Sequence, residues 1–69
     1  MNAPELTSKE AVFDFYSAVM AATGIVMVEL RHGSCAASSR WLARQWDTYF
    51  TPEQQEKILV EFTTRRLTK

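Results

Sequence analysis

The chain is poor in the residues that bind metals, form cross-links or make phosphate-binding loops. Its 69 residues include one cysteine, one histidine, two glycines and two prolines. A single cysteine excludes a disulfide within the chain and a metal site built from several cysteines. A lone histidine leaves too few ligands for an ordinary zinc site. Because the two glycines stand far apart, there is no glycine-rich phosphate loop. We therefore expect neither a cofactor nor a metal.

Long apolar runs are also absent. The longest uncharged apolar stretch, residues 18–28, is interrupted by Thr23 and Gly24 and is too short to span a bilayer. The first residues contain neither the basic nor the apolar segment of a secretory signal. We expect a cytoplasmic protein without a membrane segment, and an unpaired Cys35 fits a reducing compartment.

The sequence has no excess charge of either sign, although its charges are unevenly distributed. The formal net charge is zero. Residues 1–30 carry four acidic side chains and one basic one, whereas residues 31–69 carry seven basic side chains and four acidic ones. A dedicated nucleic-acid-binding domain is usually strongly basic, and this chain is not. The asymmetry also favours antiparallel self-association of acidic and basic halves.

The first helix is predicted over about residues 8–22. Thr7 and Glu10 form a capping-box pattern at its start, and Gly24 suits the left-handed backbone that follows a last turn. We expect residues 1–6 to be a short, frayed leader. Apolar side chains cover an arc of about 180° on this helix, wider than one neighbouring helix covers. They are Val12, Phe13, Phe15, Tyr16, Val19 and Met20.

Two more helices are predicted, over about residues 36–50 and 52–66. Pro52 disfavours a helical conformation at Thr51 and suits the first position of the last helix. Thr51 and Gln54 make a second capping-box pattern. The side chains expected to face inward are Leu42, Ala43, Trp46, Tyr49 and Phe50 in one helix, and Ile58, Leu59 and Phe62 in the other.

The stretch at 25–32 is ambiguous. Three of its first four residues are β-branched, which favours a strand, but a lone strand needs a partner from another subunit. A two-turn helix is the interpretation we favour. The predicted fold is a single all-α domain, residues 1–69, of three to four helices. We expect a homodimer, since a small chain with 46% hydrophobic residues gains burial by oligomerising.

No group of side chains predicts an enzyme. His32 and Cys35 supply the two side-chain types of a thiol nucleophile, but the sequence shows no group to orient them and no oxyanion donors. Glu53, Glu56 and Glu61 lie near the start of the last helix or on its polar side, where we expect solvated carboxylates. The sequence predicts no catalytic residue.

Trp41 is the most informative residue. It lies about 120° from the centre of the inward arc of its helix, so it reaches a core only if something packs on that second side. Otherwise it is an exposed aromatic side chain of the kind enriched in protein interfaces. Further apolar residues at helix edges are predicted to belong to the same protein-binding surface, namely Phe13, Met20, Val60 and Leu67.

Arg40 and Arg44 stand four residues apart on the outward side of the same helix. Like charges at this spacing repel, so an anionic partner would stabilise them, although Arg44 can instead pair with Asp47. We predict that they help to bind a protein partner. In an alternative, Arg31, Arg40 and Arg44 contact the phosphates of DNA in a dimeric, helix-turn-helix-like regulator.

The function predicted from sequence is therefore a small, non-enzymatic regulatory or inhibitory protein. It would bind an unidentified protein partner through an apolar and aromatic helical face. Accessory proteins of phages and plasmids have this size and composition, which is an analogy of size alone.

Overall fold

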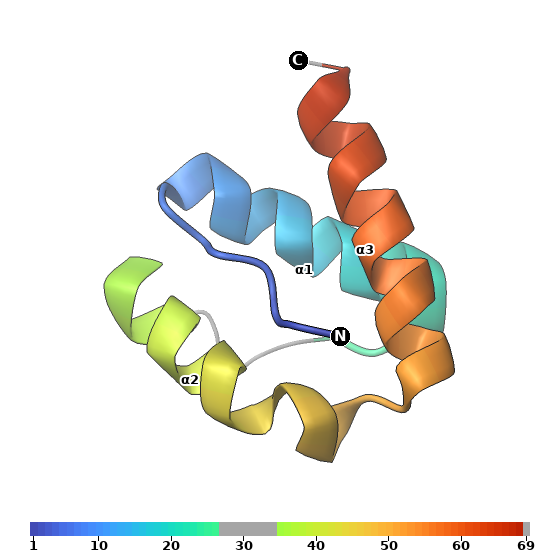
Figure 1. Cartoon of the computed structure of the whole chain (residues 1–69). Coiled ribbons are helices and arrows are strands. Elements are labelled where there is room, and N and C mark those ends of the chain that lie inside the picture. Colours follow the sequence, from blue (N-terminus) through green and yellow to red (C-terminus); the bar gives the residue numbers. More distant parts are fainter. Residues whose placement is uncertain (27–34, 69) are drawn as a thin grey trace.

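The computed structural model describes residues 1–26 and 35–68, and these residues form three helices (Figure 1). They are α1 (Lys9–Thr23), α2 (Cys35–Tyr49) and α3 (Pro52–Leu67). The predicted helices agree with these bounds to within one residue at each end. The all-α prediction is confirmed for this part of the chain. Of the short element predicted at 25–32, residues 27–32 lie outside the described residues.

The start of α1 differs from the prediction by one residue. Ser8 is the N-cap, and its hydroxyl accepts the backbone N–H of Ala11 at 3.1 Å. The capping box predicted from Thr7 and Glu10 is therefore wrong. With Ser8 as the N-cap, the third helical residue is Ala11, whose side chain cannot return a hydrogen bond to the cap as a glutamate would. The other end is as predicted, since Gly24 has a φ of 77° and donates its N–H to the Met20 carbonyl.

The N-terminal segment, residues 1–8, is bonded to α2 and places Leu6 in the core, so the predicted frayed leader at residues 1–6 is wrong. Figure 1 shows the segment running between α1 and α2. Leu6 is 2% exposed, and its backbone N–H and carbonyl both bond the Ser39 hydroxyl, at 3.0 and 2.9 Å. The Trp46 indole N–H donates to the Met1 carbonyl at 2.9 Å. Because α1 packs mainly on α3, this segment links α1 to α2.

The core is built around a chain of aromatic rings. From α3 to α2 the successive rings lie 5.1–6.2 Å apart, in the order Phe62, Phe15, Trp46, Phe50, Tyr49 and Trp41. Tilted and edge-on contacts at these distances are favourable beyond simple burial. The fully buried apolar residues surround the middle of this chain, and the outermost pair, Tyr49 and Trp41, lies toward the surface. The fully buried apolar residues are Leu6, Ala11, Phe15, Ala18, Val19, Leu42, Trp46, Phe50 and Ile58.

Two residues predicted to face inward on α2 do not. Tyr49 is 42% exposed and Ala43 is exposed, while Ser38 is buried. The inward side of α2 is rotated toward Ser38, Leu42 and Trp46, because the N-terminal segment bonds this helix at Ser39 and Trp46.

The corner between α2 and α3 is fixed by side chains that bond backbone groups. The capping box at Thr51 is confirmed, since Gln54 N–H donates to the Thr51 hydroxyl and Thr51 N–H donates to Gln54 Oε1. Gln55 is 1% exposed, and its Nε2 donates to the carbonyls of Phe50 and Trp46 at 3.0 and 3.4 Å. Gln55 thus bonds the Phe50 carbonyl beyond the end of α2 and gives the Trp46 carbonyl a second donor, beside the Phe50 N–H at 3.2 Å. None of the three described helices is long and apolar enough to cross a membrane.

Candidate functional site

The predicted binding residues lie on three separate surfaces, one on each helix. Phe13 and Met20 are on α1, Val60 and Leu67 are on α3, and α2 carries Arg40, Trp41 and Arg44. Arg31 lies outside the described residues. The structure therefore does not combine the predicted residues into one site.

The α2 surface begins with an aromatic pair. Trp41 is half-buried and packs against the edge of the core, and its ring lies 5.1 Å from that of Tyr49 at an angle of 54°. Tyr49 in turn contacts the buried Phe50, with ring centroids 6.2 Å apart. Trp41 is thus neither sealed in the core nor fully exposed. The sequence prediction missed Tyr49 because it assigned that residue to the core.

Two cations lie beside this pair. On a helix of 3.6 residues per turn, Tyr49, Trp41, Arg44 and Arg40 follow one another around a continuous arc. Both arginines are exposed, and neither forms an ion pair with any of the described residues. Asp47, the predicted partner of Arg44, instead accepts a hydrogen bond from Gln55 Nε2 at 2.9 Å. We name Arg40, Trp41, Arg44 and Tyr49 the α2 face. It is positively charged at one side and aromatic at the other.

The α1 surface contains a groove whose lining, among the residues that the structure describes, is mostly apolar. Phe13 is 67% exposed and Met20 is 48% exposed. Both line a hollow of about 610 Å³, to which α3 contributes Arg65, the one charged residue among the described lining residues. We name this hollow the α1 groove; it is lined by Phe13, Tyr16, Ser17, Met20, Ala21, Val26 and Arg65. The sequence prediction found its two largest exposed residues from their positions at the helix edge.

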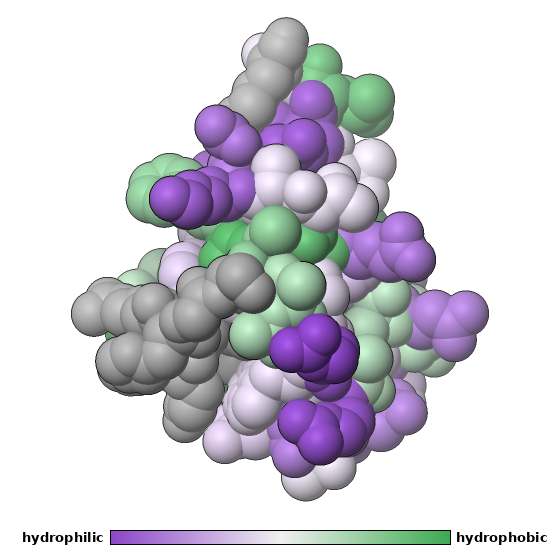
Figure 2. Space-filling view, turned by 90° about the vertical axis from the view of Figure 1, so that its left-hand side faces the viewer, coloured by the Kyte–Doolittle hydropathy of each residue, from purple (hydrophilic) through white to green (hydrophobic). Residues whose placement is uncertain are grey.

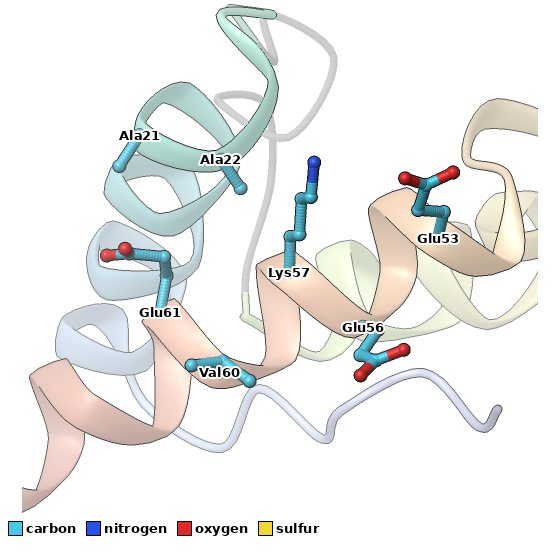
Figure 3. A pocket seen from close by; sticks show the side chains of 7 residues that line it. All are labelled: Ala21, Ala22, Glu53, Glu56, Lys57, Val60 and Glu61. Atoms are coloured by element: carbon cyan, nitrogen blue, oxygen red, sulfur yellow. The ribbon is translucent and has the colours of Figure 1, made fainter.

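The α3 surface is divided. Val60 is 61% exposed and Leu67 is 80% exposed. Val60 lines a hollow of about 490 Å³ between α3 and the end of α1 (Figure 3). In that view Lys57 extends toward the turn of α1 that carries Ala22. The carboxylates of this hollow are Glu53, Glu56 and Glu61.

These carboxylates do not form an enclosed acid–base site. Glu53 and Glu56 are exposed, and Glu61 approaches Arg65 at 3.8 Å in a partly exposed pair. No cluster of metal-binding side chains occurs in the part of the chain that the structure describes. Cys35 is the first residue of α2 and half-buried, whereas His32 lies outside the described residues. What the described surface offers is therefore apolar and charged area for binding.

Hydrophobic and hydrophilic side chains share one face of the molecule (Figure 2). In Figure 2, hydrophobic surface crosses the middle of the face, with hydrophilic side chains above and below it. Apolar and hydrophilic side chains thus alternate on this face of the molecule.

No protein-family model matches the chain, and no curated protein and no solved structure shows significant similarity to it.

Proposed function

We propose that this chain is a small, non-enzymatic regulatory or inhibitory protein of the cytoplasm that binds a protein partner through the α2 face. One observation carries the proposal: Trp41 and Tyr49 form an aromatic pair at the surface, beside two exposed arginines without ion-pair partners among the described residues. Tryptophan, tyrosine and arginine are the residues most enriched among those that contribute most to binding between proteins.

The charges of the α2 face specify the partner. Arg40 and Arg44 repel each other at their i, i+4 spacing, so carboxylates from a partner would relieve that repulsion. Guanidinium groups pair with carboxylates in a two-pronged geometry, which adds specificity to the attraction. The partner we propose is a protein with an acidic surface next to an apolar side chain that packs on Trp41.

We also propose that the protein is a homodimer. Its described residues form one small core, and large apolar side chains stay exposed on α1 and α3, chiefly Phe13, Met20, Val60 and Leu67. Burying such residues between two copies is a common way for small domains to gain stability. The α2 face need not take part, so a dimer would present two copies of it.

A dimeric, helix-turn-helix-like DNA-binding regulator is the second candidate. The exposure of Arg40 and Arg44 favours it, since phosphates would also relieve their repulsion. DNA binding through phosphates weakens steeply with salt, because neutralising them releases counterions. A titration of duplex DNA at two salt concentrations therefore separates the two candidates.

The test compares the wild-type protein with the double variant Arg40→Glu/Arg44→Glu. Proteins retained by the wild type from a lysate of its native host are purified and titrated against both forms by calorimetry. We expect an acidic protein whose affinity for the double variant falls at least tenfold. The matched control is Lys57→Glu, which reverses an exposed charge on α3 and should leave the affinity unchanged.

Two results would contradict the proposal. One is a purified partner that binds the wild type and the double variant equally well. The other is the absence of any partner that binds after purification, together with salt-sensitive binding of duplex DNA, which would favour the second candidate. Trp41→Ala is a further variant, with thermal unfolding as its control because Trp41 is half-buried.

A further inference from the structure

We infer that two copies of this chain pair through the α1 groove, with their α1 helices antiparallel and Tyr16 of each copy opposite Ser17 of the other. The inference rests on the homodimer proposed above and specifies its contact surface. It does not involve the α2 face, so the two proposals can fail separately.

The spacing of the α1 residues that line the groove suits a second helix, with Phe13 and Met20 exposed and the two residues between them half-buried. Phe13, Tyr16, Ser17 and Met20 follow the i, i+3, i+4, i+7 pattern of a helix-packing stripe, and all of them line the α1 groove. The buried side of the same helix, with Phe15 and Val19, already packs in the core. The groove adjoins this core side, because Tyr16 packs against the core and also lines the groove.

The stripe is complementary to itself when two copies run antiparallel. A two-fold axis that sets Phe13 beside Met20 of the other copy also sets Tyr16 opposite Ser17. Each large side chain then meets a smaller or more flexible one, because methionine adapts its shape to a neighbouring ring. A two-fold axis is the commonest symmetry of soluble oligomers, and it requires a self-complementary patch of this kind.

The charges around the groove agree with the antiparallel arrangement. Lys9 lies one turn before Phe13 on the same stripe, and the pairing sets it opposite Gly24 of the other copy. The last turn of α1 carries no basic side chain, so Lys9 would place a cation at the negative end of the neighbouring helix dipole.

The remaining charges do not oppose the contact. Residues 15–26 contain no charged side chain. Arg65, the charged residue of the groove, approaches Glu61 of its own copy at 3.8 Å. Arg65 therefore borders the contact beside a carboxylate of its own copy, which offsets part of its charge. A parallel pairing would lose the match between Lys9 and the helix end.

The contact is small, so the dimer should depend on concentration. A standard protein interface buries roughly 800 Å² on each partner, and one stripe of a fifteen-residue helix supplies less than that. Interfaces below the standard size are typical of weak, reversible complexes. We expect monomer and dimer to exchange within the range accessible to sedimentation equilibrium.

The first experiment measures mass by sedimentation equilibrium over a wide range of protein concentration. We expect the wild type to approach twice the monomer mass, and Phe13→Lys and Met20→Lys to remain monomeric. The control variant Leu67→Lys changes an exposed apolar residue outside the groove and should still dimerise. A wild type that stays monomeric overturns the dimer and this inference, but leaves partner binding by the α2 face intact. A dimer that Phe13→Lys does not weaken overturns the α1 contact alone.

The second experiment tests the helix direction with single cysteines in a Cys35→Ser background. In the antiparallel arrangement the two copies of residue 17 lie about 2 Å apart along the helix axis, and those of residue 10 about 20 Å apart. A short bifunctional thiol cross-linker should therefore join Ser17→Cys into dimers and leave Glu10→Cys unjoined. Efficient cross-linking of Glu10→Cys would indicate a parallel pair and overturn the inference.

Discussion

Arg66 of α3 reaches Asp14 of α1, with 2.8 Å between its Nη1 and the carboxylate Oδ2. The two residues are 52 positions apart in the sequence. The Asp14 side chain is 5% exposed, whereas that of Arg66 is 38% exposed. The carboxylate is therefore the buried member of the pair, and the guanidinium stays partly hydrated. This contact fixes the C-terminal half of α3 across the middle of α1.

Because the carboxylate of this pair is buried and the guanidinium is partly exposed, removing the arginine alone should cost more stability than removing both charges. Arg66→Ala leaves the buried carboxylate without its guanidinium and should lower the free energy of unfolding by about 1–3 kcal/mol. Asp14→Asn/Arg66→Ala should recover part of that loss, because no buried charge remains. Urea unfolding followed by circular dichroism measures both. The control is Arg65→Ala, because its pair with Glu61 is 3.8 Å long and partly exposed at both ends, so that losing the ion pair should cost less than losing the one with buried Asp14.

The N-terminal segment is predicted to be essential for stability. Leu6→Ala removes a side chain that is 2% exposed and should cost about 2–5 kcal/mol. A chain of this length has a total stability of roughly 3–10 kcal/mol, so the variant should be partly or largely unfolded. Leu67→Ala is the matched control, because its side chain is 80% exposed and should change the melting temperature little. Equal melting temperatures for the two variants would contradict the core position of Leu6.

Gln55 is predicted to stabilise the corner between α2 and α3 through its amide nitrogen. Gln55→Met keeps the side-chain length but loses the bonds to Asp47 and to the Phe50 and Trp46 carbonyls, at a cost of about 1–3 kcal/mol. Gln55→Glu should cost more, because it places a carboxylate against carbonyl oxygens. Thermal unfolding at neutral pH should rank the wild type first, the methionine variant second and the glutamate variant last. A glutamate variant as stable as the wild type would refute this role.

The end of α1 depends on the backbone freedom of Gly24. A Cβ added at this position meets no atom within 4 Å, so the cost of Gly24→Ala is conformational and not steric crowding. At a φ of 77° that cost is about 1–2 kcal/mol, and Gly24→Asn should cost less because asparagine tolerates the left-handed region. Chemical denaturation of the three proteins measures the order. If Gly24→Ala were as stable as the wild type, the left-handed backbone at residue 24 would not be needed to end α1, which would contradict the prediction.

The helices were predictable because their signals are local. Gly24, Thr51 and Pro52 act on the backbone within a few residues of themselves, and the three predicted helices lie within one residue of those observed. The position of Trp41 away from the inward arc of α2 was also readable, because it follows from the helical period alone. The exposure of Phe13 and Met20 followed from an apolar arc too wide for one neighbour.

What sequence reasoning missed depends on contacts between distant residues. Nothing local indicates that Leu6 would bond Ser39, or that the Trp46 indole would bond the Met1 carbonyl, and so the leader was expected to fray. The same contacts rotate α2 and leave Tyr49 at the surface. The pairing of Asp14 with Arg66 was likewise not foreseen.

Local patterns were enough to predict the three described helices to within one residue at each end, and to show more apolar side chains than one small core needs. These properties follow from capping, turn geometry and helical periodicity, each of which acts over a few residues. Only the tertiary structure decided which of those side chains became core and which became surface. That choice depends on which helix faces meet, and here it was made by an N-terminal segment packed between α1 and α2 and by an ion pair that joins α1 to α3.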